Sequence, residues 1–130
     1  FGQLGVDDVS PRGIGNSSGV AVFARMVQVT VGLQHTCLLL ADTSARCFGF
    51  NGHGELGLGH REHRGGQAGD MASLPAVDFG ATPFVSQIAA GECHTCALVA
   101  AAEEGRKDVK CWGCGGSGQL GVGALASVGG

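Results

Sequence analysis

One four-residue motif recurs three times along the chain and constrains its fold more than any other feature. Gly2-Gln3-Leu4-Gly5 returns as residues 54–57 and again as residues 118–121. Two further blocks recur between these copies in the same order, Gly32–Leu39 with Gly91–Leu98 and Arg46–Gly49 with Lys110–Gly113. Repetition at about 50–60 residues indicates an array of similar supersecondary units, each of which buries its apolar faces against neighbours.

Each unit is predicted to consist of short β-strands. Val27, Val29 and Val31 alternate with polar residues before a glycine, which is the period of a half-buried strand. An apolar segment follows each His-Thr-Cys, and after a turn a second strand carries a cysteine and an aromatic residue. The 25 glycines among 130 residues, of which 44% are hydrophobic, suit tight turns between such strands. We therefore expect an all-β fold of propeller type.

The blocks His-Thr-Cys-Ala-Leu, Lys-Cys-Trp-Gly and Gly-Gln-Leu-Gly resemble the repeat of the regulator of chromosome condensation family over roughly residues 1–123. The resemblance implies a seven-bladed β-propeller of four-stranded blades. This chain would be a single partial propeller of about two blades, with repeats 2–53 and 54–117 and the start of a third repeat at 118–130. Since it opens in mid-motif and without Met, we expect a fragment of a longer propeller.

The chain also departs from the family pattern in three segments. Residues 6–26 match poorly, and within them residues 10–13 and 15–19 have the composition of loops. The usual Asp-Gly turn is Asp42-Thr43 in the first repeat, and because a β-branched residue disfavours positive φ, we expect a reshaped turn. The second repeat inserts five residues there, within Ala101–Asp108.

The six cysteines suggest disulfides across the hairpins. Directly opposed residues of an antiparallel hairpin have a constant sum of residue numbers, and three pairs can lie across hairpins in this way: Cys37–Cys47, Cys96–Cys111 and Cys93–Cys114. The last two should face opposite sides of their sheet. A zinc site at Cys93, Cys96, Cys111 and Cys114 is the alternative, since the spacing approaches that of a zinc ribbon. The first repeat retains only the inner pair, which favours disulfides over zinc or free thiols, and disulfides favour an oxidising compartment.

Other chemistry has little support in the sequence. The net charge is −3 and no run of basic residues is present, which argues against a nucleic-acid surface. No apolar run reaches the roughly 18 residues of a membrane helix. His35 and His94 recur in one setting, so we interpret them as buried rings that hold backbone polar groups rather than as catalytic bases. Phe48 and Trp112 share one repeat position and are predicted to pack in the core. We expect no enzyme activity and no cofactor.

The segment Leu58–Ser73 is the candidate contact loop. It is polar, rich in glycine, longer than an ordinary connection, and it contains His60, Arg61, His63 and Arg64. A metal site at His60 and His63 is a minor alternative, because no third ligand is adjacent in the sequence.

The predicted function is a non-catalytic protein–protein interaction scaffold or accessory subunit of a larger assembly, in a lumenal or other extracytoplasmic place, where it could dock on a membrane complex. The partners would be other protein chains or the remaining blades. Two alternatives follow from the family resemblance. One is a guanine-nucleotide exchange factor for a small GTPase, and the other is a secreted propeller that binds or inhibits an enzyme.

Overall fold

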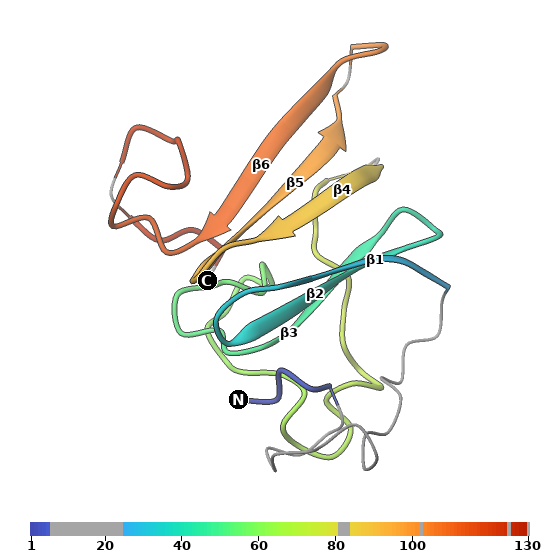
Figure 1. The fold of residues 1–130 in the computed structure, drawn as a ribbon, viewed down its shortest axis with the longest axis vertical. Helices are drawn as coiled ribbons and strands as arrows, with labels where there is room; N and C mark the ends of the chain where they lie inside the picture. The colour runs from blue at the N-terminus through green and yellow to red at the C-terminus, as the bar shows by residue number, and fades with distance from the viewer. Residues whose placement is uncertain (6–24, 81–83, 102, 125, 130) are drawn as a thin grey trace.

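The computed structural model describes residues 1–5, 25–80, 84–101, 103–124 and 126–129. Six strands form in chain order: β1 (Met26–Val31), β2 (His35–Leu40), β3 (Ala45–Gly49), β4 (Val85–Ala90), β5 (His94–Ala100) and β6 (Lys107–Gly113). They make two antiparallel sheets of three strands, β1-β2-β3 and β4-β5-β6, each a simple meander (Figure 1). The expected all-β partial propeller of about two blades is confirmed. The loops expected at residues 10–19 lie outside the described residues.

The two sheets repeat each other in register as well as in strand order. Val29 lies opposite Leu38 in the first sheet, and Ile88 lies opposite Ala97 in the second, at the equivalent positions. The outer strand of each sheet ends on a glycine that makes an isolated bridge, Gly49 with Arg64 and Gly113 with Val128. The fourth strand implied by the family resemblance is thus reduced, within the described residues, to one bridge for each blade.

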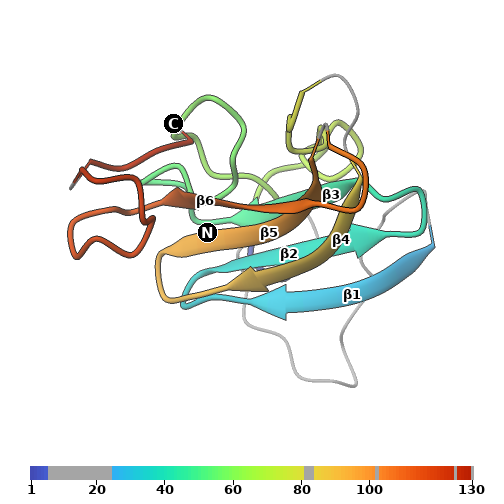
Figure 2. The same ribbon diagram turned by 90° about the horizontal axis from the view of Figure 1, so that it is seen from above.

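The blades pack against each other through one face of each sheet, as Figure 2 shows from above. Alternate residues of β2 and β3 face the second blade, because successive side chains of a strand point to opposite sides. The largest core cluster fills this interface, with Cys37, Leu39, Ala45 and Cys47 from the first blade, Val85, Ile88, Ala97, Val99 and Trp112 from the second, and Leu56 and Val77 from the connection between them. The interface between blades is therefore the main hydrophobic core.

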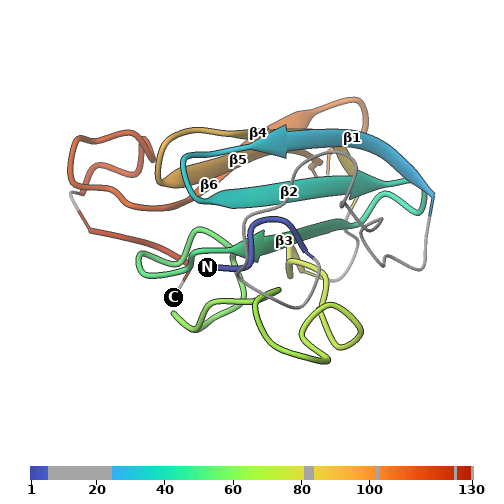
Figure 3. The same ribbon diagram turned by 60° about the horizontal axis from the view of Figure 1, so that its bottom comes forward.

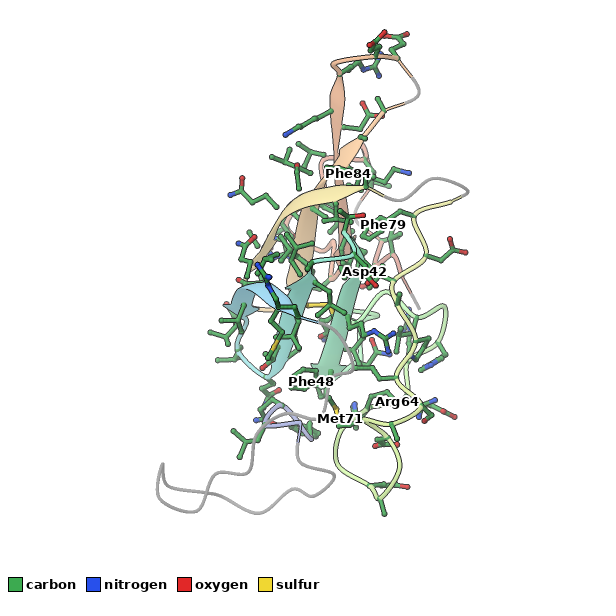
Figure 4. The ribbon with its side chains drawn as sticks, turned by 90° about the vertical axis from the view of Figure 1, so that its right-hand side faces the viewer. Asp42, Phe48, Arg64, Met71, Phe79 and Phe84 are labelled. Carbon is green, nitrogen blue, oxygen red and sulfur yellow. A yellow bond between two sulfur atoms is a disulfide. The ribbon has the colours of Figure 1, made fainter. Side chains whose placement is uncertain are left out.

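A second, smaller cluster covers the other face of the first blade. It consists of Leu38, Leu40, Phe48, Met71 and Leu74, all at most 4% exposed. Figure 4 shows Phe48 of β3 beside Met71, which comes from the long connection between the blades. That connection therefore covers part of a sheet face that would otherwise lie in water.

The Gly-x-Leu-Gly motif forms the same turn in all three copies. Both glycines have positive φ in every copy, between 63° and 86°, which suits residues without a Cβ. The fourth residue donates its N–H to the carbonyl of the first, at 2.9 to 3.1 Å. A Cβ on Gly57 would lie 2.8 Å from the Trp112 ring, and one on Gly5 equally close to the Phe48 ring. Figure 3 shows the first copy, at the N-terminus, lying against β3. The first two turns thus each contact the aromatic ring of one blade, and both rings are buried core residues.

The alternation in β1 predicts a half-buried strand, and the side that is exposed is the apolar one: Val27, Val29 and Val31 are 56%, 63% and 66% exposed. The polar residues between them face the second blade. The expectation of a reshaped turn at Asp42 is wrong: Thr43 takes φ of 68°. Hydrogen bonds hold it there, from Thr43 N to Leu40 O and from Val85 N to Thr43 O.

Candidate interaction surface

A buried chain of hydrogen bonds links the two blades through the repeated His-Thr motif. Nε2 of His35, on β2, lies 2.9 Å from Oγ1 of Thr95, on β5. The Thr95 hydroxyl donates at 3.0 Å to the Glu55 carbonyl, which also accepts the Trp112 indole N–H at 2.8 Å. Since the hydroxyl proton is committed to Glu55, the imidazole must be the donor to Thr95. His35, Thr95 and Glu55 are at most 2% exposed, so this network is shielded from water.

The histidines differ in part from the sequence-based interpretation. His35 is buried as expected, but its partner is a side chain of the neighbouring blade rather than backbone. Burial lowers the pKa of His35 below its ordinary value, an effect that the Glu55 charge opposes in part. His94, at the equivalent place in the second blade, is only half-buried. The same motif therefore joins two blades at one position and stands partly open at the other.

The innermost strands are joined by an amide side chain. Gln28 of β1 donates from Nε2 to the Ile88 carbonyl at 2.6 Å and accepts from the Ile88 N–H through Oε1 at 3.1 Å. Thr30 Oγ1 accepts the Ala90 N–H at 3.0 Å. Gln28 thus satisfies the backbone edge of β4 in the way that a further strand would.

The cysteines form the three pairs expected from the hairpin registers. Cys37–Cys47 and Cys96–Cys111 span directly opposed residues with Cα atoms 4.1 Å apart, and Cys93–Cys114 spans 5.6 Å. We call the first two the β2–β3 disulfide and the β5–β6 disulfide. Cys93 borders a cavity of about 230 Å³ shared with the first blade, whereas Cys96 borders one of about 170 Å³ on the opposite face of the sheet. The four sulfurs of the zinc alternative are therefore divided between two bonds on two faces.

The candidate contact loop is held in place by a buried residue that sequence analysis missed. Asn51 is fully buried, and its amide donates to the His60 and Glu62 carbonyls at 2.8 and 3.0 Å. Its Oδ1 accepts the Leu56 N–H, and its own backbone N–H donates to Nδ1 of His63. These bonds fix the loop backbone while leaving Arg61, Glu62 and His63 exposed. No repeat signals Asn51, because the second copy has glycine at this position.

The second half of the loop is fixed by a carboxylate. Asp70 Oδ2 accepts three successive backbone N–H groups, those of residues 65–67, at 2.9 to 3.1 Å. Arg64 pairs its backbone with Gly49 and makes an exposed contact with Glu62 at 3.4 Å. The loop is thus a rigid projection at the end of the molecule opposite the β5–β6 turn (Figure 1).

A cavity of about 470 Å³ adjoins this loop, lined by Phe1, His63, Gly66, Gln67 and Asp70. The His63 ring stacks on Phe50 with centroids 4.8 Å apart, and Phe1 packs edge-on against both rings. The structure therefore brings His63 and Asp70 together beside an aromatic wall. Arg61 lies apart from the cavity lining and is exposed.

The metal alternative at His60 and His63 finds no support in the geometry. His60 Nδ1 accepts the Glu62 N–H and His63 Nδ1 accepts the Asn51 N–H. A neutral imidazole that accepts through Nδ1 carries its proton on Nε2, so neither ring offers a free lone pair. In the described part of the chain no three His, Cys, Asp or Glu side chains are grouped to bind a metal ion. The same residues form no helix long and apolar enough to cross a membrane.

Solved structures with the same fold support the blade assignment. Human WBSCR16 aligns with 98% of this chain and 31% of its own, at 22% identity and a TM-score of 0.68. Prp20p of Saccharomyces cerevisiae aligns with 98% of this chain and 30% of its own, at 19% identity and a TM-score of 0.64. These similarities establish the β-propeller fold.

Sequence comparison points to the same family. Residues 26–55 match the profile of the regulator of chromosome condensation (RCC1) repeat. The probable E3 ubiquitin-protein ligase HERC4 of Rattus norvegicus is 31% identical over 127 residues, which is 98% of this chain and 11% of that protein. The ultraviolet-B receptor UVR8 of Arabidopsis thaliana is 30% identical over 123 residues, 95% of this chain and 25% of that protein. The chain thus spans a tenth to a quarter of these relatives, and it is built from repeats of the regulator of chromosome condensation family, folded as blades of that family's β-propeller.

Proposed function

We propose that this chain is a non-catalytic protein–protein interaction module, a scaffold or accessory subunit, and that Leu58–Ser73 forms its contact loop. The main support for this proposal is the buried Asn51. Its four hydrogen bonds hold the loop backbone in place while Arg61 and His63 remain exposed. A loop fixed in this way loses little conformational entropy when a partner binds. The adjoining cavity of about 470 Å³ offers a place for one partner side chain.

The non-catalytic part of the proposal is supported by how the histidines are used. His35 is buried and bonded to a threonine hydroxyl whose own proton goes to a carbonyl, so that hydroxyl is not poised as a nucleophile. His60 and His63 accept backbone N–H groups through Nδ1, with no carboxylate on that nitrogen to orient them as bases.

Site-directed photocrosslinking tests the contact loop. A photoreactive residue replaces Arg61 in one preparation and the exposed Lys107, near the far end of the β5–β6 hairpin, in another. In extract from the native source, position 61 should give a discrete protein adduct that position 107 does not. The adduct should weaken with Asn51→Ala, which releases the loop backbone, and persist with Asp108→Ala. Equal adducts from both positions, or none from position 61, would overturn the proposal.

We also propose an oxidising compartment, such as the cell exterior, a periplasm or an organelle lumen. Three cysteine pairs lie at bonding distance, and such pairs persist where thiols are not kept reduced. Mass spectrometry of the chain isolated from its native source should show a gain of about two protons per pair on reduction. Full alkylation before any reductant is added would contradict this assignment.

The exchange-factor alternative is tested with the same chain. Prp20p binds Gsp1p and histones, and those partners belong to that protein. Stimulated nucleotide release from a purified small GTPase would favour an exchange factor over the scaffold. Specific capture of an extracellular enzyme at position 61 would favour the secreted binder instead.

A further inference from the structure

The cavity of about 230 Å³ that Cys93 borders lies between the two blades, at the end where the β1–β2 and β4–β5 turns run side by side (Figure 2). The Leu33 N–H donates to the Glu92 carbonyl at 3.1 Å and joins these turns. The lining residues fall within residues 33–55 and 92–93. Both walls therefore come from the place where the two sheets meet.

A buried carboxylate lines this cavity. Glu55 is 1% exposed, and its Oε2 accepts the His53 N–H at 2.9 Å. An ionised carboxylate can accept about four hydrogen bonds, and this one accepts no other from the described residues. Among these residues no Lys or Arg side chain lines the cavity, and none forms an ion pair with Glu55. Because a buried charge without a counter-ion is unfavourable, the charge of Glu55 lowers the stability of the fold unless a ligand balances it.

The turn that contains Glu55 does not need this charge. Gln119 stands at the same place in the third copy of the motif, and its Oε1 accepts the Ser117 N–H at 2.8 Å, just as Glu55 accepts from His53. The first copy also has a glutamine, Gln3. A neutral amide therefore makes the hydrogen bond that the turn requires, and the negative charge at position 55 has no role in forming it.

A second buried acceptor borders the same cavity. His35 is 2% exposed and donates from Nε2 to Thr95, so its Nδ1 carries a lone pair. No described residue donates to that nitrogen. Because burial lowers the pKa of His35, the ring is neutral at pH 7 and does not balance the charge of Glu55. The cavity thus presents two buried acceptors, one of them charged, to a ligand that has N–H donors and a positive charge.

The groups at the cavity mouth favour a guanidinium over other cations. Phe50 is half-buried and His53 is exposed, and their ring centroids lie 6.1 Å apart. The exposed Glu92 adds a second carboxylate. A guanidinium packs on aromatic rings and presents a planar fork of donors, whereas a lysine ammonium is a strongly hydrated point charge. A volume of about 230 Å³ is also smaller than the roughly 300–1,000 Å³ of ordinary small-molecule sites, so it suits a single side chain.

We propose that this cavity binds an arginine side chain of a partner protein, whose guanidinium donates to the Glu55 carboxylate and to Nδ1 of His35. The aliphatic part of that side chain packs on Phe50 at the cavity mouth. Hydrogen bonds between charged groups are stronger than those between neutral groups, and the guanidinium supplies the counter-ion that Glu55 lacks. The site is next to the contact loop, since Phe50 stacks on His63, but it contains no residue of Leu58–Ser73. It is therefore a second binding site, beyond the proposed contact loop.

A nuclear magnetic resonance titration of the ¹⁵N-labelled, oxidised chain tests the proposal. The probe is Nα-acetyl-arginine amide, added at constant ionic strength. The amide signals of Leu33 and His53 should shift and reach saturation. Nα-acetyl-citrulline amide has nearly the same shape without the charge, and it should give no saturable shift. Nα-acetyl-lysine amide should bind more weakly than the arginine probe, because its ammonium offers no planar fork.

Two variants locate the site. Glu55→Gln keeps an acceptor for the His53 N–H and removes the charge, and it should weaken binding of the arginine probe about tenfold or more. Glu104→Gln removes the same charge from the exposed β5–β6 turn, and it should bind the probe like the unmodified chain. Without the probe, Glu55→Gln should have a urea midpoint equal to or above that of the unmodified chain, because the unbalanced charge is gone.

The proposal is wrong if the arginine probe gives no saturable shift, if citrulline or lysine binds equally well, or if Glu55→Gln binds as tightly as Glu104→Gln. A lower urea midpoint for Glu55→Gln would also overturn it, because the charge would then be part of what holds the fold. The titration uses neither the contact loop nor a partner protein. Its failure therefore leaves the contact-loop proposal standing, and failure of the crosslinking leaves this one standing.

Discussion

The Thr95 hydroxyl connects the two blades, and Thr95→Val removes it without changing the shape of the side chain. Thr95 is fully buried, accepts from His35 and donates to the Glu55 carbonyl. Valine would leave the buried imidazole N–H without a partner, at about 1–3 kcal/mol. Glu55 retains its bond from Trp112, so its carbonyl adds only about 0.5 kcal/mol. We expect the free energy of unfolding to fall by about 1.5–3.5 kcal/mol.

Thr36→Val is the matched control, because the same residue type stands at the same repeat position. Thr36 is half-buried and donates only to the Gln3 carbonyl, with no histidine of a described blade on its hydroxyl. We expect Thr36→Val to lower the free energy of unfolding by the contribution of one ordinary hydrogen bond, about 0.5–1.5 kcal/mol. The difference in the free energy of unfolding between the two variants therefore measures the cost of leaving the buried His35 N–H without a hydrogen-bond acceptor.

Urea unfolding of the oxidised chain measures both variants. With a slope of about 1–3 kcal/mol per molar urea, Thr95→Val should lower the midpoint by about 1 M at an unchanged slope. Adding His35→Leu to Thr95→Val should cost less than the sum of the separate changes, since the orphaned donor is removed as well. Equal midpoints for Thr95→Val and Thr36→Val, or strict additivity in the double variant, would refute the inter-blade network.

Three further predictions follow from the same structure. Thr43→Gly should raise the urea midpoint by an amount equivalent to about 1 kcal/mol or less. Glycine removes the strain of a β-branched residue at positive φ, and its greater chain entropy in the unfolded state offsets part of that gain. A lower midpoint would contradict this. Mild reduction followed by alkylation and mass spectrometry should open the half-buried β5–β6 disulfide before the β2–β3 disulfide, whose sulfurs are fully buried; simultaneous opening would count against it. Burial lowers the pKa of His35, so the unfolded chain binds a proton below about pH 6.5 that the folded chain excludes. Stability should therefore be fully present above that pH and fall below it, and His35→Gln should flatten this part of the profile of urea midpoint against pH.

The strands and the cysteine pairs could be predicted from the sequence because both depend on local pattern. Period-two alternation located β1, and the constant residue-number sum gave three pairs that fit hairpins, two of which lie in the observed registers, since an antiparallel hairpin has one register over a short span. The turn at Thr43 was mispredicted for a reason that is not local. Its carbonyl accepts the Val85 N–H of the next blade, so a contact far along the chain helps to hold a conformation that the residue itself disfavours.

The candidate contact loop was located by its length and polarity, but its rigidity was not. Asn51 occurs once in the repeat pattern, and its four bonds reach residues five to twelve positions away that share no spacing rule. The contacts of the Asp70 carboxylate could not be predicted from the sequence either, because its three hydrogen-bond donors are backbone N–H groups, which every residue except proline has. Composition therefore predicts an exposed loop, and only the folded backbone shows what holds it.

By itself the sequence determined the repeat and the all-β class, and it offered the hairpin registers and three cysteine pairs beside a zinc alternative, because each of these follows from spacing along a short stretch of chain. The tertiary structure decided which side of each strand is covered. The valines of β1 look like a core face in the sequence, yet they are open, while Gln28 and Thr30 point into the interface. The physical reason is that a blade has two apolar faces and burial depends on what packs against each, a relation between blades that residue spacing within one strand does not contain.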